Sequence, residues 1–416
     1  MSQSHETAQD CTPTPLMNDP DHQSWLIAQA KAQFDFFRDS LRPDGGFYVL
    51  ETDGSPLDNT VQELHTTTRL IHSYALGETA GFEKCDEIID HGMRYLWNAH
   101  RDIDCGGYFW AIDGAVPHDT VKLAYGHVFV LLAGASAKTA GHPDADRLIQ
   151  DATDVIDRHF WQDDVGLLSD EYSRDWTPFS TYRGFNANMH GTEAMLAAFE
   201  ATGTETYLHR AGRMLDFFVN RIASARGWRV SEHYDDTWTP DPDYAGNPMF
   251  RPWGTTPGHS FELGRLMIQF WDLSGRPDDD SLANARRLIE TALDDAWLDA
   301  GGFAYTLDYT GNAHISDRYW WPVTEAIGAC AALIKADGRP EDELWYRKLW
   351  HCASNMFIDH EHNGWFPEID ADNRPVANQF IGKPDIYHSI QATLFPLVPN
   401  LSMNLSGLKE NWPPMP

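Results

Sequence analysis

Apolar residues recur every three or four positions over two alternating sets of segments, which is the spacing of one face of an α-helix. The first set is rich in small and apolar residues and covers residues 62–80, 123–140, 189–202, 259–273 and 320–336. The second set carries charges on one face and covers residues 82–97, 145–161, 205–222, 280–297 and 341–357. We expect the first set to be buried and the second set to form a solvent-facing outer layer.

A glycine followed by an aromatic or aliphatic residue separates successive helix pairs. These turns begin at Gly46, Gly107, Gly166, Gly227, Gly302 and Gly364, mostly about sixty residues apart. A unit of that length holds two helices and a short hairpin. Six units predict an all-α fold of twelve helices, and because the first set is apolar nearly all round, we expect the units to close into a ring. The ring would be a barrel of six inner helices inside six outer ones, with the short β-hairpins gathered at one mouth.

The 416 residues contain no linker rich in Ser, Gly or Pro, so we expect one domain. Residues 1–21 are polar and predicted to be flexible, residues 22–400 to form the barrel, and residues 401–416 to be a C-terminal tail. The chain shows neither an apolar run of eighteen residues nor a secretion signal, and its five cysteines are scattered. We therefore expect no membrane span and a cytoplasmic location with reduced thiols.

The net charge of −31, from 31 basic and 62 acidic residues, excludes a nucleic-acid partner, because phosphate binding requires a basic face. The charge says nothing about the substrate. Oligomeric state is likewise left open by the sequence.

Titratable residues gather where the inner helices are expected to begin. At these positions stand His65 and Arg69; Tyr125 and His127; Asn186, Asn188, His190 and Glu193; His259 and Glu262; Trp320, Trp321 and Glu325; and His388. Five of these six groups contain a histidine, so we expect a polar, titratable pocket at the mouth.

Helical spacing pairs some of these side chains. His259 and Glu262 are three residues apart, as are His190 and Glu193, so each pair shares a helix face. A carboxylate beside an imidazole fixes its tautomer and raises its pKa, which suits acid/base catalysis near neutral pH. The same residue types could bind zinc or manganese, but no His-Glu-x-x-His motif or acidic cluster accompanies them, and we expect no metal and no cofactor.

Aromatic residues near the mouth indicate the substrate class. Trp110, Tyr125, Trp253, Trp320, Trp321 and Tyr387 all fall there. Indole faces beside carboxylates, amides and Arg suit a sugar, which offers C–H faces and a ring of hydroxyl groups.

Six segments resemble the N-acylglucosamine 2-epimerase superfamily, and within it the aldose–ketose isomerase branch that includes mannose and sulfoquinovose isomerases. The segments are HTTTRLIHSYALG (65–77), YGHVFVLLAGA (125–135), NANMHGTEAMLAAFEATG (186–203), TTPGHSFELGRLM (255–267), RYWWPVTEAIGA (318–329) and GKPDIYHSIQAT (382–393). The resemblance runs from about residue 22 to 398. It implies an (α/α)6 barrel, catalysis without a metal, and functional roles for Arg69, His190, His259 with Glu262, and His388.

Such an enzyme interconverts D-mannose and D-fructose, or a close aldose/ketose pair, through a cis-enediol. The resemblance implies that His388 carries the proton between C2 and C1, and that His259, polarised by Glu262, opens the sugar ring. Arg69 and His190 would stabilise the oxygens at C1 and C2, and Glu325 would orient a histidine or a hydroxyl group. Substrate binding is assigned to Tyr125, Asn186, Trp320, Trp321, Glu325 and Arg251.

Three alternatives stay open. A 2-epimerase would use the same two histidines on opposite faces of C2. A sulfoquinovose isomerase would need a cationic or amide-rich pocket, for which Arg251, Arg183 and Gln379 are candidates. An (α/α)6 glycoside hydrolase would instead use two opposed carboxylates about 5 to 9.5 Å apart.

Overall fold

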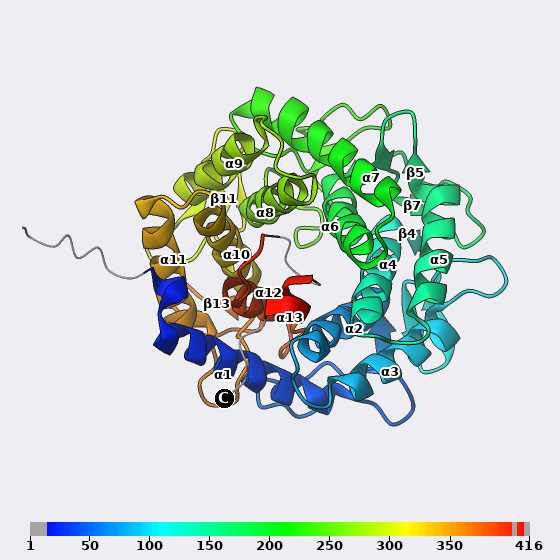
Figure 1. The fold of residues 1–416 in the computed structure, drawn as a ribbon. Coiled ribbons are helices and arrows are strands. Elements are labelled where there is room, and N and C mark those ends of the chain that lie inside the picture. The colour runs from blue at the N-terminus through cyan, green and yellow to red at the C-terminus, as the bar shows by residue number, and fades with distance from the viewer. Residues whose placement is uncertain (1–14, 402–405, 412–416) are drawn as a thin grey trace, which may run out of the picture.

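Two concentric layers of helices form a closed ring in the computed structural model, which describes residues 15–401 and 406–411 (Figure 1). The outer layer consists of α1 (Pro20–Phe37), α3 (Cys85–Tyr95), α5 (Ala145–Val155), α7 (Glu205–Leu215), α9 (Ser281–Ala296) and α11 (Pro340–Cys352). The inner layer consists of α2 (Leu64–Thr79), α4 (Ala124–Thr139), α6 (Phe185–Thr202), α8 (Pro257–Leu273), α10 (Trp320–Ala336) and α12 (Tyr387–Leu394). The predicted all-α (α/α)6 barrel is confirmed.

The two layers differ as the apolar pattern predicts. Every residue of α10 from Trp320 to Leu333 is buried, so this inner helix is enclosed on all sides. The outer helix α5 instead buries one stripe, formed by Ala145, Leu148, Ile149 and Ala152, and turns its charged residues to solvent.

Four outer helices end differently from the prediction. The predicted continuous helices give way to wider π-helical turns after α3, α5, α7 and α11, at Leu96–His100, Ile156–Phe160, Asp216–Ala223 and Ala353–Phe357. The expected helical spans covered two of these segments, Ile156–Phe160 and Ala353–Phe357, completely and the other two in part. A π turn keeps the helical side-chain direction while opening the hydrogen-bond ladder, so apolar periodicity alone does not separate it from an α-helix.

Short antiparallel strands link neighbouring units at the mouth of the barrel. They pair as β1 (Val61–Glu63) with β2 (Ala111–Asp113), β4 (Lys122–Leu123) with β7 (Glu171–Tyr172), β8 (Arg183–Gly184) with β9 (His233–Tyr234), and β12 (Arg318–Tyr319) with β13 (Glu368–Ile369). The first strand of each pair runs directly into an inner helix, and its partner belongs to the next unit. The hairpins are completed by β2 with β3 (Val116–Asp119), β5 (Trp161–Gln162) with β6 (Leu167–Leu168), and β10 (Thr306–Leu307) with β11 (Ala313–Ile315). This collar fixes where the first turn of each inner helix lies.

Glycine at the repeated turns is required by both conformation and space. Gly107 has φ +69°, and a Cβ atom there would lie 2.7 Å from Nε2 of His127. A side chain would therefore be strained and would displace a buried ring.

The ends of the barrel lie slightly outside the predicted limits. The first helix begins at Pro20 rather than residue 22, and Leu16–Asn18 forms a 3-10 helix with Met17 buried. At the other end, α13 (Ser406–Asn411) lies over the centre of the ring and buries Leu408 (Figure 1). Apolar side chains dock both segments, whereas residues 1–14, 402–405 and 412–416 lie outside the described part of the chain.

Every described helix is too short or too polar to cross a bilayer.

Candidate active site

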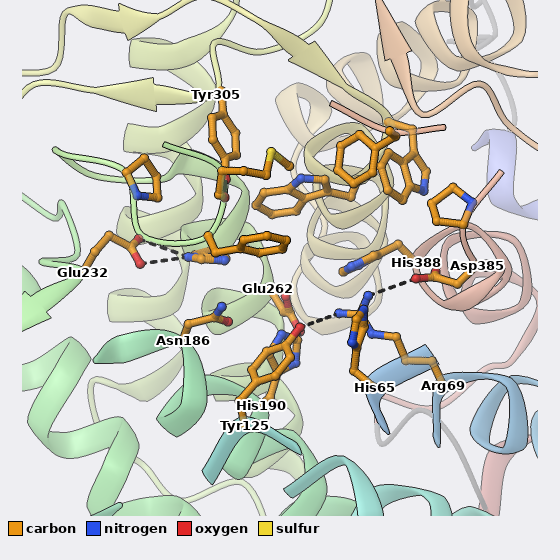
Figure 2. Close-up of a pocket in the computed structure, with 18 of the residues that line it drawn as sticks. His65, Arg69, Tyr125, Asn186, His190, Glu232, Glu262, Tyr305, Asp385 and His388 are labelled. Atoms are coloured by element: carbon orange, nitrogen blue, oxygen red, sulfur yellow. Dashed lines mark hydrogen bonds and ion pairs between the residues drawn. The ribbon is translucent and has the colours of Figure 1, made fainter. Parts of the chain in front are cut away.

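A cavity at the mouth of the barrel is walled by the first turns of the inner helices and by the collar (Figure 2). It brings together ten of the residues that the sequence singled out: His65, Arg69, Tyr125, Asn186, His190, His259, Glu262, Trp320, Trp321 and His388. These residues come from segments more than three hundred positions apart in the chain. The predicted pocket is therefore present, and the individual contacts define its chemistry.

His388, in the first turn of α12, is held by a carboxylate from α10. Its Nδ1 atom lies 2.8 Å from Oε1 of Glu325, and both side chains are buried. The other oxygen of Glu325 lies 3.4 Å from Arg265, which keeps the carboxylate charged. Because Nδ1 donates to Glu325, Nε2 of His388 is the nitrogen that can take up a proton. Glu325 itself stands behind the histidine and does not line the cavity.

His259 is held in the same way, but not by the residue that the spacing predicted. Its Nδ1 atom lies 3.0 Å from Oε2 of Glu232, which directly precedes β9. The backbone N–H of Thr256 also donates to Glu232, so the collar fixes this carboxylate at the start of α8. The pairing of His259 with Glu262 is therefore wrong. A three-residue spacing places two side chains on one helix face without turning them towards each other.

Glu262 faces the inside of the barrel one turn deeper. Its Oε1 atom lies 3.4 Å from Nδ1 of His190, and within the described residues neither of its oxygens accepts a hydrogen bond. Burial, followed by the charges of Glu325 and Glu193, raises the pKa of Glu262 well above its usual range. Burial therefore favours the protonated form of this carboxyl group.

His190 contacts Glu193, as the sequence predicted, with Nδ1 3.3 Å from Oε2. The expectation that the carboxylate would raise its pKa is wrong, because burial outweighs the carboxylate and lowers the pKa of His190 to about 4. The imidazole of His190 is therefore neutral at physiological pH, with one nitrogen that can accept a proton and one N–H group that can donate.

Arg69 provides the positive charge of the site. One guanidinium nitrogen lies 3.0 Å from Oδ2 of Asp385 and another lies 3.0 Å from the hydroxyl of Tyr125. The guanidinium also packs against the rings of Phe129 and Tyr387, at 4.9 and 4.6 Å from their centroids. These four contacts fix the orientation of the guanidinium group. Asp385 was not singled out from the sequence, although it lies in the same KPDIYH segment as His388.

Trp321 lies between the two carboxylate-held histidines. Its ring centroid is 5.2 Å from that of His259 and 5.8 Å from that of His388. Both imidazoles therefore border one cavity. The collar adds side chains that the helix pattern could not reveal, namely Tyr182, Glu232, His233, Met249, Phe250, Tyr305 and Phe380.

Two histidines from the inner helices have other environments. His65 lines the cavity and stacks on Trp110 at 5.1 Å, and burial lowers its pKa to about 3. His127 does not reach the cavity. Its Nδ1 donates to the carbonyl of Leu123, while Nε2 accepts from the N–H of Tyr108. The expectation that His127 belongs to the pocket is wrong, because its ring turns outwards to the turn at Gly107.

Arg251 is not part of the catalytic cavity but borders an adjoining one. It lies 2.7 Å from Glu171 and stacks over Tyr182 at 4.0 Å, so its charge is already neutralised. Its assignment to the sugar site is not supported by this position. Arg183 donates to the carbonyl of Tyr182, and Gln379 borders a separate groove. These three side chains do not form the cationic pocket that a sulfonate group would require.

Three buried carboxylates gather beneath the histidines, contrary to the expectation that no acidic cluster accompanies them. Donor atoms of His190, Glu193 and Glu262 lie within 4.8 Å of one another, and so do those of Glu262, Glu325 and His388. A metal ion could bridge groups at this spacing. Hydrogen bonds from His190 and His388, together with the charge of Arg265, already stabilise the carboxylates of Glu193 and Glu325.

A closed double ring of helices, with carboxylate-held imidazoles around a cavity at one mouth, defines an (α/α)6-barrel protein. The model of the family N-acylglucosamine 2-epimerase (GlcNAc 2-epimerase) matches residues 45–392, and the chain belongs to this family. The enzyme is an isomerase.

Named relatives cover nearly the whole chain. The chain is 39% identical over 396 residues to D-mannose isomerase of Thermobifida fusca, which covers 93% of this chain and 96% of that protein. It is 37% identical to D-mannose isomerase of Pseudomonas cannabina pv. alisalensis, with 94% and 97% covered. A crystal structure of D-mannose isomerase superposes with a TM-score of 0.84 at 33% identity, covering 89% of this chain and 96% of that one. Cellobiose 2-epimerase from Spirochaeta thermophila, at 21% identity and a TM-score of 0.81, shares the fold.

Proposed function

We propose that this protein interconverts D-mannose and D-fructose without a metal cofactor, through a cis-enediol. The observation that carries the proposal is that His259 and His388, each held at Nδ1 by a buried carboxylate, border one cavity with Trp321 between them. The relatives that are named D-mannose isomerases support the choice of sugar.

His259 is the group proposed to open the sugar ring. The anomeric hydroxyl loses its proton, the bond between C1 and the ring oxygen breaks, and the ring oxygen gains a proton. Nε2 of His259 can carry the proton in either direction, because Glu232 holds Nδ1 and stabilises the imidazolium that forms. The product of this step is the open-chain aldehyde.

His388 is the proposed base for carbon. Its Nε2 takes the proton from C2, the electron pair forms the C1–C2 double bond, and the carbonyl oxygen at C1 becomes the enediolate oxygen. Arg69 stabilises that negative charge. The O2 proton moves to O1 through neutral His190, and the imidazolium of His388 returns its proton to C1, which leaves the ketone at C2.

Proton NMR of the purified enzyme with mannose in deuterated water, in the presence of a chelator, tests this proposal. We expect fructose as the first product, with deuterium entering at C1. Glucose as the first product would favour 2-epimerisation by the same histidines. Loss of activity with the chelator, restored by a divalent metal, would refute the metal-independent mechanism.

Glycoside hydrolysis would need two carboxylates facing the sugar across the cavity. Glu232, Glu262 and Asp385 line the cavity, but Glu232 is bonded to His259 and Asp385 to Arg69. Glu325 lies behind His388 and is bonded to it. The paired imidazoles therefore favour isomerisation over hydrolysis.

We also propose a cytoplasmic location. In the described part of the chain, Cys85, Cys105, Cys330 and Cys352 are free, and three of them are buried thiols. Unpaired thiols are typical of a reducing compartment. Cell fractionation that places the protein outside the cytoplasm would contradict this assignment.

A further inference from the structure

At the floor of the catalytic cavity, two carboxyl groups lie within reach of the single Nδ1 atom of His190. Nδ1 of His190 lies 3.3 Å from Oε2 of Glu193 and 3.4 Å from Oε1 of Glu262. All three side chains are buried. Because one N–H group donates well to only one acceptor at a time, the orientation and tautomer of His190 depend on which carboxylate carries the charge.

Tyr387 favours Glu193. Its hydroxyl donates to Oε2 of Glu193, the same oxygen that faces His190. The two residues come from α12 and α6 and are 194 positions apart in sequence. The ring of Tyr387 is fully buried and packs against Arg69 and Phe129. Burial raises the pKa of Tyr387 well above its usual range, so the hydroxyl keeps its proton and remains a donor.

The charges agree with this geometry. Burial opposes ionisation of Glu193, but the hydrogen bond from His190 and neighbouring positive groups lower its pKa to about 2. Glu262 has no such donor, and its pKa is raised. Glu193 is therefore the stronger acceptor for Nδ1–H, because it ionises more readily than Glu262 and also binds the Tyr387 hydroxyl.

We propose that Tyr387 and Glu193 are positioning residues, which hold neutral His190 with its proton on Nδ1 and leave Nε2 free to exchange protons with sugar oxygens. The effect of this tautomer on catalysis rests on the proposed isomerisation, in which a proton moves between O2 and O1. An imidazole with an unprotonated Nε2 can accept the O2 proton, whereas the opposite tautomer cannot. Neither Tyr387 nor Glu193 lines the cavity, so both act through His190.

Tyr387→Phe removes only the hydroxyl and keeps the ring against Arg69. We expect kcat for mannose to fall about tenfold with KM within about twofold, because substrate contacts are unchanged. Glu193→Gln should reduce kcat further, since the amide can donate to Nδ1 and move the proton of His190 to Nε2. Tyr74→Phe is the matched control, because its buried hydroxyl donates to the carbonyl of Phe34 in α1, away from the cavity. It should leave both constants unchanged.

Side-chain ¹⁵N NMR of histidine-labelled protein reads the tautomer without any substrate, with the His190 signals assigned by their loss in His190→Gln. We expect protonated Nδ1 and unprotonated Nε2 in the wild type and in Tyr74→Phe, and a mixed or reversed pattern in Glu193→Gln. An Nε2-protonated His190 in the wild type, or an unaltered tautomer in Glu193→Gln, would overturn the positioning role. If the tautomers behave as expected but mannose is not isomerised, only the proposed reaction fails.

Discussion

Glu325 and His388 are joined by a 2.8 Å contact between Oε1 and Nδ1, although 63 residues separate them and both are buried. Glu232 and His259 repeat the arrangement at 3.0 Å on the other side of Trp321. Each carboxylate fixes the proton on Nδ1 and leaves Nε2 for the substrate. The site therefore contains two oriented imidazoles that can act on different bonds of the same sugar.

Glu325→Gln tests whether this contact sets the tautomer of His388. The amide can donate to Nδ1, which would place the proton on Nε2 and abolish its function as a base. We expect kcat for mannose to fall by roughly 100-fold or more with a smaller change in KM, measured by initial rates and by deuterium entry into the sugar. Glu290→Gln, on the exposed face of α9, is the control. A kcat close to that of the wild type would mean that Glu325 does not orient the base.

The two histidines can be separated by substrate choice. A tetrose cannot close a six-membered ring, so it depends less on ring opening than mannose does. We expect His259→Asn to lose much more activity on mannose than on L-erythrose, which has the same configuration at C2 and C3, and His388→Asn to lose activity on both by roughly 100-fold or more. Initial rates on the two sugars give the comparison. Equal losses on both sugars in His259→Asn would show that this residue does more than open rings.

Lys122 and Asp102 form a buried ion pair at 3.0 Å, and neither side chain is exposed. Asp102→Asn would leave the ammonium group without its counter-charge, and we expect the free energy of unfolding to fall by about 3–5 kcal/mol. Urea titration monitored by circular dichroism measures it. Asp35→Asn removes an exposed partner of Lys31 on α1 and should cost less than about 1 kcal/mol. Similar losses of unfolding free energy in the two variants would mean that the buried ion pair of Asp102 stabilises the fold no more than an exposed one.

Buried histidines predict a loss of stability in mild acid. Burial lowers the pKa of His72 and His100 to about 4 and that of His127 to about 3. Their folded pKa values lie below the ordinary value, so the unfolded chain binds more protons. The stability they contribute is complete above about pH 6.5 and is lost as pH falls towards 4, at up to about 1.4 kcal/mol per group and pH unit.

His127→Gln isolates one of these contributions, because raised pKa values at Asp170 and Glu262 act in the opposite direction. We expect the variant to be less stable than the wild type at pH 7.5, because it loses a hydrogen bond. Between pH 7.5 and pH 5, its free energy of unfolding should fall by less than that of the wild type. Urea unfolding at both pH values provides the measurement. A slope as steep as that of the wild type would contradict the assignment of a neutral buried His127.

The helices, their two layers and the first turns that hold the site were predictable because each depends on neighbouring residues. Apolar spacing identifies α2 and α10 as enclosed helices, and Gly107 marks a turn that needs positive φ. The convergence of His190, His259 and His388 followed from the closure of six equal units, since all three lie near the starts of inner helices.

The partners of these residues were decided by the tertiary structure. Glu232 reaches His259 from the collar, and Asp385 reaches Arg69 from a segment 316 residues away. Burial, not the adjacent carboxylate, determines the pKa of His190. Helical spacing reports which residues share a face, whereas hydrogen-bond partners and desolvation depend on what other segments bring within a few ångströms once the ring has closed.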